Sequence, residues 1–356
     1  MTNTPLKLGL LGTGAAVQKL HLPPLTELHG EIKLAGVWSQ SFENARAFAA
    51  EHSVDRCYAD YRELLADPGI EAVLVAVPIE RNAAFLIEAV EAGKHVLAEK
   101  PIAASVAEAR HVLDASERSD RLVAIAENFR YRDDIAQARR IIESGAIGSV
   151  QCFQGTSVFD LLKEVRRVYM EKAWRREPRH PGGLVVDAGV HTVAGLREIL
   201  GEIEEVYAQL MSDSPVTSGP DGLVMQLKLA SGAPGHYLTC YTAQTDREAG
   251  FELIAYGSLG TLWLTEGKVE WTGQDGVRSS WSAESHDRGY RVQWRNFLAA
   301  VRGHESVYST PEKGFGDLLV LEAALHSART RQRVVVDEYM RTVFVNGGTA
   351  ENQCES

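Results

Sequence analysis

The chain has few cysteines and no long apolar run. Its 356 residues include only four cysteines, Cys57, Cys152, Cys240 and Cys354. No two of them have the short spacing that is typical of a zinc site or a disulfide framework. Free thiols with no disulfide or metal-binding role are typical of proteins in the reducing cytosol. No apolar run approaches the roughly 18 residues that span a bilayer, and the N-terminus has no apolar signal core. We therefore expect a cytoplasmic protein with no metal site and no membrane partner.

Basic residues are outnumbered by acidic ones, 37 lysines and arginines against 48 aspartates and glutamates. The formal net charge is −11, and no basic tract interrupts the sequence, which argues against nucleic acid as a partner. The charged fraction of 24% and the hydrophobic fraction of 45% are those of a soluble globular protein. A chain of this length exceeds one ordinary core, so we expect two domains.

The first third of the chain alternates strand-like and helix-like segments. Such alternation predicts an α/β fold with a doubly wound parallel sheet of the Rossmann type, over residues 1–128. The strand-like runs are 6–11, 32–39, 56–58, 72–77, 95–98 and 122–126.

Beyond this region long β-like runs predominate. They indicate a second, α+β domain over 129–345, built on a large, mostly antiparallel open sheet. A hairpin is expected around 273–276, and helices 290–301 and 311–330 are expected to flank this sheet. Residues 346–356 are expected to form a loose tail.

A glycine-rich turn follows the first strand directly. Gly12 permits a tight turn, Gly14 lets the backbone approach a pyrophosphate, and the next helix N-terminus attracts the phosphates. Val17 stands where a third glycine or alanine is usual, so the helix should lie slightly farther from the strand. We predict a dinucleotide site formed by Gly12, Thr13, Gly14, Ala15 and Ala16.

The end of the second strand lacks the carboxylate with which NAD-preferring sites bind the ribose 2′-hydroxyl. The chain has Ser39, Gln40 and Ser41 there, which can donate hydrogen bonds to a 2′-phosphate, and Arg46 is a more distant cation. We expect NAD(P) as the cofactor and favour NADP.

Lys100 lies within Glu99-Lys100-Pro101, where a strand ends downstream of the glycine turn. This position is suited to the reactive end of a dinucleotide, and Pro101 restricts Lys100 to an extended conformation. Glu99 is expected to fix the strand end by hydrogen bonding. We expect His21 and His180 in surface or loop positions.

A second chemical segment lies near the middle of the chain. If a helix begins near Gly183, Asp187 and His191 project from one face, one turn apart. Alone, they could be a core histidine and its local partner. The presence of Lys100 and the Gly12 turn in the same chain favours a catalytic site.

Together these motifs resemble the Gfo/Idh/MocA family of NAD(P)-dependent sugar and cyclitol oxidoreductases, over nearly the whole chain. The resemblance rests on the Gly12 turn, Glu99-Lys100-Pro101, Asn128-Phe129-Arg130-Tyr131, Trp174-Arg175 and the segment from Gly182 to His191. It implies a Rossmann domain followed by an α/β domain whose open sheet faces the active site and supports homodimers or homotetramers.

The resemblance also implies that Lys100, Asp187 and His191 act at the substrate. The family commonly has an Asp three residues beyond the His, whereas this chain has Ala194 there and Arg197 one turn farther. Hydride transfer from a carbinol needs a group that takes the hydroxyl proton, and His191 suits this role. Lys100 can polarise the oxygen or relay the proton, and Asp187 can orient His191 or bind an adjacent hydroxyl.

The remaining expected contacts surround this centre. We expect cofactor contacts also from Val77, Pro78, Glu99, Lys100 and Asn128, and substrate contacts from Lys100, Arg130, Tyr131, Trp174, Arg175, Asp187, His191 and Arg197. The arginines would suit a carboxylate or phosphate, but a neutral sugar or cyclitol is the default substrate. Two alternatives stay open: a catalytically silent dinucleotide-binding sensor, and a hydrolase or lyase that uses tightly bound NAD for transient oxidation.

Overall fold

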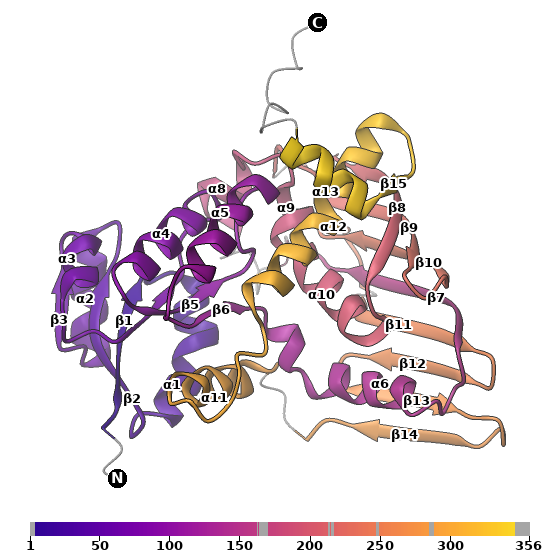
Figure 1. Ribbon diagram of the computed structural model, residues 1–356, viewed down its shortest axis with the longest axis horizontal. Coiled ribbons are helices and arrows are strands. Elements are labelled where there is room, and N and C mark those ends of the chain that lie inside the picture. The colour runs from indigo at the N-terminus through magenta and orange to yellow at the C-terminus, as the bar shows by residue number, and fades with distance from the viewer. Residues whose placement is uncertain are drawn as a thin grey trace, which may run out of the picture. The chain divides into compact units, whose positions relative to one another are not determined.

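The protein forms two compact units, each with its own sheet. The computed structural model describes residues 4–161, 163, 170–212, 214, 217–246, 249–284 and 288–345 (Figure 1). The first unit contains the chain up to Ala104, Glu108–Glu127 and Tyr290–Phe315. The second contains Ser105–Ala107, Asn128–Gly289 and the chain from Gly316 onward.

The first unit is built on a parallel sheet of six described strands in the order β3-β2-β1-β4-β5-β6. The predicted doubly wound parallel sheet is therefore confirmed. The order reverses between β1 and β4, and ligands bind at such a switch point. The strands are β1 (Leu6–Leu11), β2 (Ile32–Trp38), β3 (Arg56–Tyr58), β4 (Ala72–Val75), β5 (His95–Glu99) and β6 (Val123–Ala126).

Helices cover this sheet on both faces. Figure 1 shows α4 and α5 over one face and α1 and α11 over the other. Every residue of β4 is buried, as expected for a parallel strand covered on both sides. The helices are α1 (Leu22–Glu27), α2 (Phe42–His52), α3 (Tyr61–Ala66), α4 (Ile79–Glu91), α5 (Val106–Glu117) and α11 (Tyr290–Val301), and a π-helical turn (Val17–His21) precedes α1.

Helix α11 packs on the first unit. Trp294, Phe297 and Leu298 belong to the same apolar cluster as Leu8 and Leu25 of β1 and α1. The prediction that 290–301 flanks the second sheet is therefore wrong. The sequence shows which face of this helix is apolar, but only the tertiary structure shows which surface that face covers.

The second unit is built on a sheet of nine strands in the described chain, in the order β14-β13-β12-β11-β7-β10-β9-β8-β15. Only β7 and β10 pair in parallel, so the mostly antiparallel sheet is confirmed, as is the β13–β14 hairpin. The strands are β7 (Val150–Val158), β8 (Ile203–Met211), β9 (Gly222–Leu229), β10 (Pro234–Cys240), β11 (Ala249–Gly257), β12 (Thr261–Thr265), β13 (Lys268–Thr272), β14 (Arg278–Ser282) and β15 (Val334–Val335).

One face of this sheet is buried and the other is open. Leu253 and Leu262 lie on the buried face, whereas Tyr256 is 41% and Trp263 is 42% exposed on the opposite face. The other helices within the described residues are the 3-10 helix η2 (Asn128–Tyr131), α6 (Asp133–Glu143), α8 (Ala173–Arg176), α9 (Gly183–Asp187), α10 (Gly189–Leu200), α12 (Pro311–Thr330) and α13 (Val336–Val345).

No helix in the described part of the chain combines the length and the apolar character needed to cross a membrane. Residues 346–356, predicted to form a loose tail, lie outside the described residues.

The packing of α11 can be tested with two substitutions on that helix. Phe297 is 1% exposed, so Phe297→Ala should leave a cavity and lower the free energy of unfolding of the first unit by about 3–5 kcal/mol. Val292 is 44% exposed on the same helix, so Val292→Ala should change it by about 0.5 kcal/mol or less. Chemical denaturation of both variants is the measurement, and equal losses would contradict this packing.

Candidate functional site

The turn after β1 can be built only with glycine. Gly12 has a φ of +116°, and a Cβ there would lie 2.2 Å from the carbonyl oxygen of Ala76. The Gly12 N–H donates to the carbonyl of Trp38 at 2.8 Å, so the ends of β1, β2 and β4 meet at this turn. A Cβ on Gly14 would meet no described atom within 4 Å. The backbone is therefore open to a pyrophosphate at this point.

The end of β2 joins the same turn. The Thr13 hydroxyl donates to Ser39 Oγ at 3.1 Å, and Ser41 Oγ caps α2 by accepting the Asn44 N–H at 3.3 Å. The N-terminus of α2 thus lies close to the predicted site of a 2′-phosphate. Val17 is fully buried where the third glycine is usual, within the π-helical turn.

Arg81 is a second cation near the end of β2, and the strand-end motif does not include it. Its guanidinium lies 4.7 Å from the ring centre of Phe85 and 6.0 Å from that of Trp38, the last residue of β2. Arg46, the cation expected from the sequence, is 62% exposed and lies 3.8 Å from Glu43. The spacing of Arg81 and Phe85, one helical turn apart on α4, is the signal that could have pointed to it.

The backbone around Lys100 is held on both sides. Asn82 Nδ2 donates to the carbonyl of Glu99 at 2.5 Å and to that of Pro101 at 2.8 Å. Glu99 Oε2 accepts the Lys100 N–H at 3.2 Å, and the Lys100–Pro101 peptide bond is cis. The side chain of Glu99 thus fixes the end of β5 by hydrogen bonding, as expected from the sequence.

His21 and His180 are both buried. His21 has no exposed surface and its Nε2 lies 2.7 Å from Glu99 Oε1, so its expected surface or loop position is wrong. Val17 and His21 are both buried, and their spacing of four residues, which places them on one helical face, is the sequence signal of this burial. His180 lies in a loop, as expected, but is only 6% exposed.

In the second unit three of the predicted substrate residues lie together. Arg175 Nε donates to Asp187 Oδ2 at 2.6 Å. The same guanidinium lies 4.2 Å from the centre of the Trp174 ring, in a cation–π arrangement. Arg175 therefore fixes one carboxylate oxygen of Asp187 and one aromatic surface. Arg176, beside it on α8, is exposed.

The helix predicted through Asp187 and His191 is interrupted. Helix α9 ends at Asp187 and α10 begins at Gly189, although Ala188 between them keeps right-handed helical angles of φ −96° and ψ −31°. The His191 ring stacks on Phe129, with ring centres 5.0 Å apart and an angle of 22° between the planes. Phe129 thus sets the plane of the imidazole, a role that its place in the motif did not reveal.

A buried polar layer supports α10 from the sheet. The Tyr237 hydroxyl donates to Thr192 Oγ1 at 2.7 Å, and Thr192 Oγ1 donates to the carbonyl of Gly189 at 3.0 Å. Burial raises the pKa of Tyr237 and raises that of Tyr241 well above its ordinary value. Both phenols therefore remain protonated, and Tyr237 donates to the helix that carries His191.

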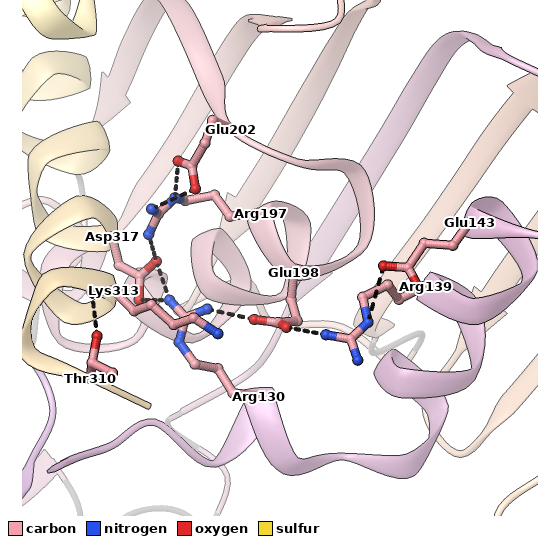
Figure 2. Close-up of polar contacts among 9 residues, drawn as sticks. All are labelled: Arg130, Arg139, Glu143, Arg197, Glu198, Glu202, Thr310, Lys313 and Asp317. Atoms are coloured by element: carbon pink, nitrogen blue, oxygen red, sulfur yellow. Dashed lines mark hydrogen bonds and ion pairs between the residues drawn. The ribbon is translucent and has the colours of Figure 1, made fainter. Parts of the chain in front are cut away.

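Two predicted substrate arginines lie in a buried ion network (Figure 2). Arg130 donates to Glu198 at 2.8 Å and to Asp317 at 2.6 Å, and the side chains of Arg130 and Asp317 are each 2% exposed. Arg197 binds the same Asp317, and also Glu202 at 2.8 Å. Burial opposes the charge of Arg197, but Asp317 and Glu202 outweigh it and raise its pKa. These matched charges favour a structural role for both arginines.

Asn128 and Tyr131 are held inside the second unit. Tyr131 is 7% and Asn128 is 3% exposed, and Asn128 Nδ2 donates to the carbonyl of Arg288 at 2.8 Å. Val77 and Pro78 belong to the first unit and follow Ala76, whose carbonyl oxygen lies against Gly12.

No group of three histidine, cysteine, aspartate or glutamate side chains in the described chain is arranged to hold a metal ion.

Two family models match the chain. The model described as "Oxidoreductase family, NAD-binding Rossmann fold" matches residues 6–127, and "Oxidoreductase family, C-terminal alpha/beta domain" matches residues 139–336. The protein belongs to the Gfo/Idh/MocA family.

Named relatives and a solved structure are similar over long stretches. Levoglucosan dehydrogenase of Pseudarthrobacter phenanthrenivorans is 33% identical over 181 residues, which cover 50% of this chain and 45% of that protein. Myo-inositol 2-dehydrogenase of Thermotoga maritima is 24% identical over 94% of this chain and 99% of its own. An oxidoreductase of Thermotoga maritima has a TM-score of 0.87 and 29% identity, covering 94% of this chain and 100% of its own.

The departure from the Gfo/Idh/MocA pattern lies on α10. Ala194, where the family commonly has an Asp, has no exposed surface. The Arg197 guanidinium, one turn farther along, is bound by Asp317 and Glu202.

The ion network can be tested by removing one carboxylate. Asp317→Asn should lower the free energy of unfolding by about 3–5 kcal/mol, because it leaves two buried guanidinium groups without their shared partner. The matched control is Glu202→Gln, since Glu202 is 67% exposed and its loss should cost about 1 kcal/mol or less. Denaturation curves measure both values, and equal costs would show that the network does not depend on burial.

Proposed function

We propose that this oxidoreductase transfers hydride between a nicotinamide cofactor and a secondary alcohol or ketone of a sugar or cyclitol. The observation that carries the proposal is the anchored Lys100 backbone at the carboxyl end of β5, in the same unit as the glycine turn. The named activities of the levoglucosan and myo-inositol dehydrogenases support this substrate class.

Each polar group has a role that its environment suits. The His191 imidazole, stacked on Phe129, takes or returns the hydroxyl proton of the substrate. The Lys100 ammonium stabilises negative charge on the carbinol oxygen. Asp187, fixed by Arg175, binds an adjacent hydroxyl, and Trp174 offers an apolar surface to the sugar ring. When bound, the nicotinamide supplies the hydride acceptor.

The first prediction of this proposal concerns the two proton-handling residues. Lys100→Ala and His191→Ala should each lower turnover by at least ~100-fold, because general acid–base groups contribute about that much, and neither should unfold the protein. Exposed residues of the same types, Lys33→Ala and His29→Ala, are matched controls. Turnover is measured by absorbance of the reduced nicotinamide with sugars, sugar acids and inositols.

Near-normal turnover in either variant would exclude that residue. The same assay separates the alternatives. A dehydrogenase accumulates reduced cofactor in proportion to product, whereas a hydrolase or lyase with transient oxidation forms product without it. A silent sensor gives neither.

We also propose that the cofactor site accepts NADP in preference to NAD. Support comes from the missing carboxylate at the end of β2, the hydroxyl of Ser39, the capped N-terminus of α2 at Ser41 and the Arg81 guanidinium beside Trp38.

This preference can be reversed at Ser39. Ser39→Asp should raise the KM for NADPH by at least ~10-fold, because its carboxylate repels a 2′-phosphate, and should leave the KM for NADH nearly unchanged. Ser39→Asn is the matched uncharged control. A clear preference of the unmodified protein for NADH would overturn the proposal.

Finally, we propose that the protein is a homodimer or homotetramer that associates through the open face of the second sheet. Tyr256 and Trp263 are large, partly exposed side chains on that face. A groove beside them is lined by residues that include Cys152, Gln154, Tyr207 and His236. Exposed apolar surface of this kind is typical of an interface.

A further inference from the structure

We propose that His21 is a positioning residue that fixes the Glu99 carboxylate and, through it, the backbone of Lys100. The proposal rests on the function assigned above to Lys100. It concerns a buried imidazole that the hydride-transfer scheme does not otherwise use. All the residues involved belong to the first unit.

The His21 imidazole is bonded through both ring nitrogens. Its Nε2 lies 2.7 Å from Glu99 Oε1, and its Nδ1 lies 3.1 Å from Nε1 of Trp294 on α11. The rings of Tyr290 and Trp294 meet it edge-on, with centres 5.6 Å and 5.7 Å away. The ring has no exposed surface. Its orientation is therefore set by contacts on several sides.

Trp294 determines which nitrogen carries the proton. An indole N–H can only donate, so His21 Nδ1 must accept and carries no proton. The proton of the neutral ring then lies on Nε2, which donates to Glu99 Oε1. A proton on Nδ1 would place two N–H groups against each other. Helix α11, which lies late in the sequence, thus selects one tautomer of a histidine near the N-terminus of the chain.

The bond from His21 continues to Lys100. One carboxylate oxygen of Glu99 accepts from His21, and the other accepts the Lys100 N–H at 3.2 Å. The carbonyls on either side of Lys100, those of Glu99 and Pro101, are held by Asn82. Without His21 the Glu99 carboxylate would lose the bond that fixes its rotation, and the Lys100 amide would lose a fixed acceptor.

Three substitutions separate positioning from simple core packing. In His21→Gln the amide presents a donor and an acceptor with nearly the spacing of the two ring nitrogens, so both bonds can form. His21→Leu keeps apolar bulk and removes both bonds. Trp294→Phe keeps an aromatic ring and removes only the N–H that selects the tautomer.

The experiment uses the full chain and needs no knowledge of the substrate for its first part. The ¹⁵N shifts of the His21 ring report the tautomer, and hydrogen exchange reports the Lys100 amide relative to the Val75 amide of the neighbouring strand β4. The second part measures kcat with myo-inositol and levoglucosan as probes, and the Kd for NADH and NADPH by fluorescence.

The expected result has four parts. In the unmodified protein the proton resides on Nε2, and Trp294→Phe gives a mixture of tautomers. His21→Leu speeds exchange of the Lys100 amide at least ~10-fold more than that of Val75, and lowers kcat by about 10–100-fold with little change in cofactor Kd. His21→Gln restores the exchange rate of the Lys100 amide and kcat to within ~3-fold of the unmodified protein.

Equal exchange and equal kcat in the Leu and Gln variants would overturn the proposal, as would a proton on Nδ1 in the unmodified protein. If the unmodified protein oxidises neither probe, the proposed substrate class fails, whereas the exchange and tautomer measurements still decide the role of His21.

Discussion

The backbone segment from Glu99 to Pro101 is the constraint on which the candidate site depends. Asn82 holds its two flanking carbonyls, and the Glu99 carboxylate holds the amide of Lys100. An ammonium on a flexible stem can act at one oxygen only if its own backbone does not move, since small displacements of reacting groups are costly. The glycine turn follows β1 of the same sheet, so one compact unit carries both the predicted cofactor turn and the lysine.

In the second unit, buried ion pairs fix the position of the helix that carries His191. Helix α10 carries His191 on one side and Arg197 and Glu198 farther along. Arg130 of η2 bonds Glu198 (Figure 2). The preceding residue, Phe129, stacks on His191. The ion network therefore fixes η2 against α10, and with it the ring that sets the plane of the imidazole. Such a network is costly to desolvate and favours one arrangement only when every charge has a partner.

Much of this could be predicted from the sequence, because the signals are local. The alternation of strands and helices predicts the parallel sheet, and the β-like runs predict the antiparallel one. Gly12 directly follows a strand, and the turn there has no room for a Cβ. The sequence is less informative where a residue's environment depends on a distant partner. Arg130 and Arg197 are paired with Asp317, and the burial of His21 depends on Glu99 and Trp294. Neither pairing leaves a periodic trace in the sequence, and neither does the return of α11 to the first unit.

We propose that Lys100 and His191 act on the same substrate carbinol. A crystal structure of the protein with NADPH and a bound polyol tests it most directly. We expect Lys100 Nζ and a ring nitrogen of His191 each to lie within about 3 Å of one substrate oxygen. A complex in which these two groups open onto different cavities would contradict it.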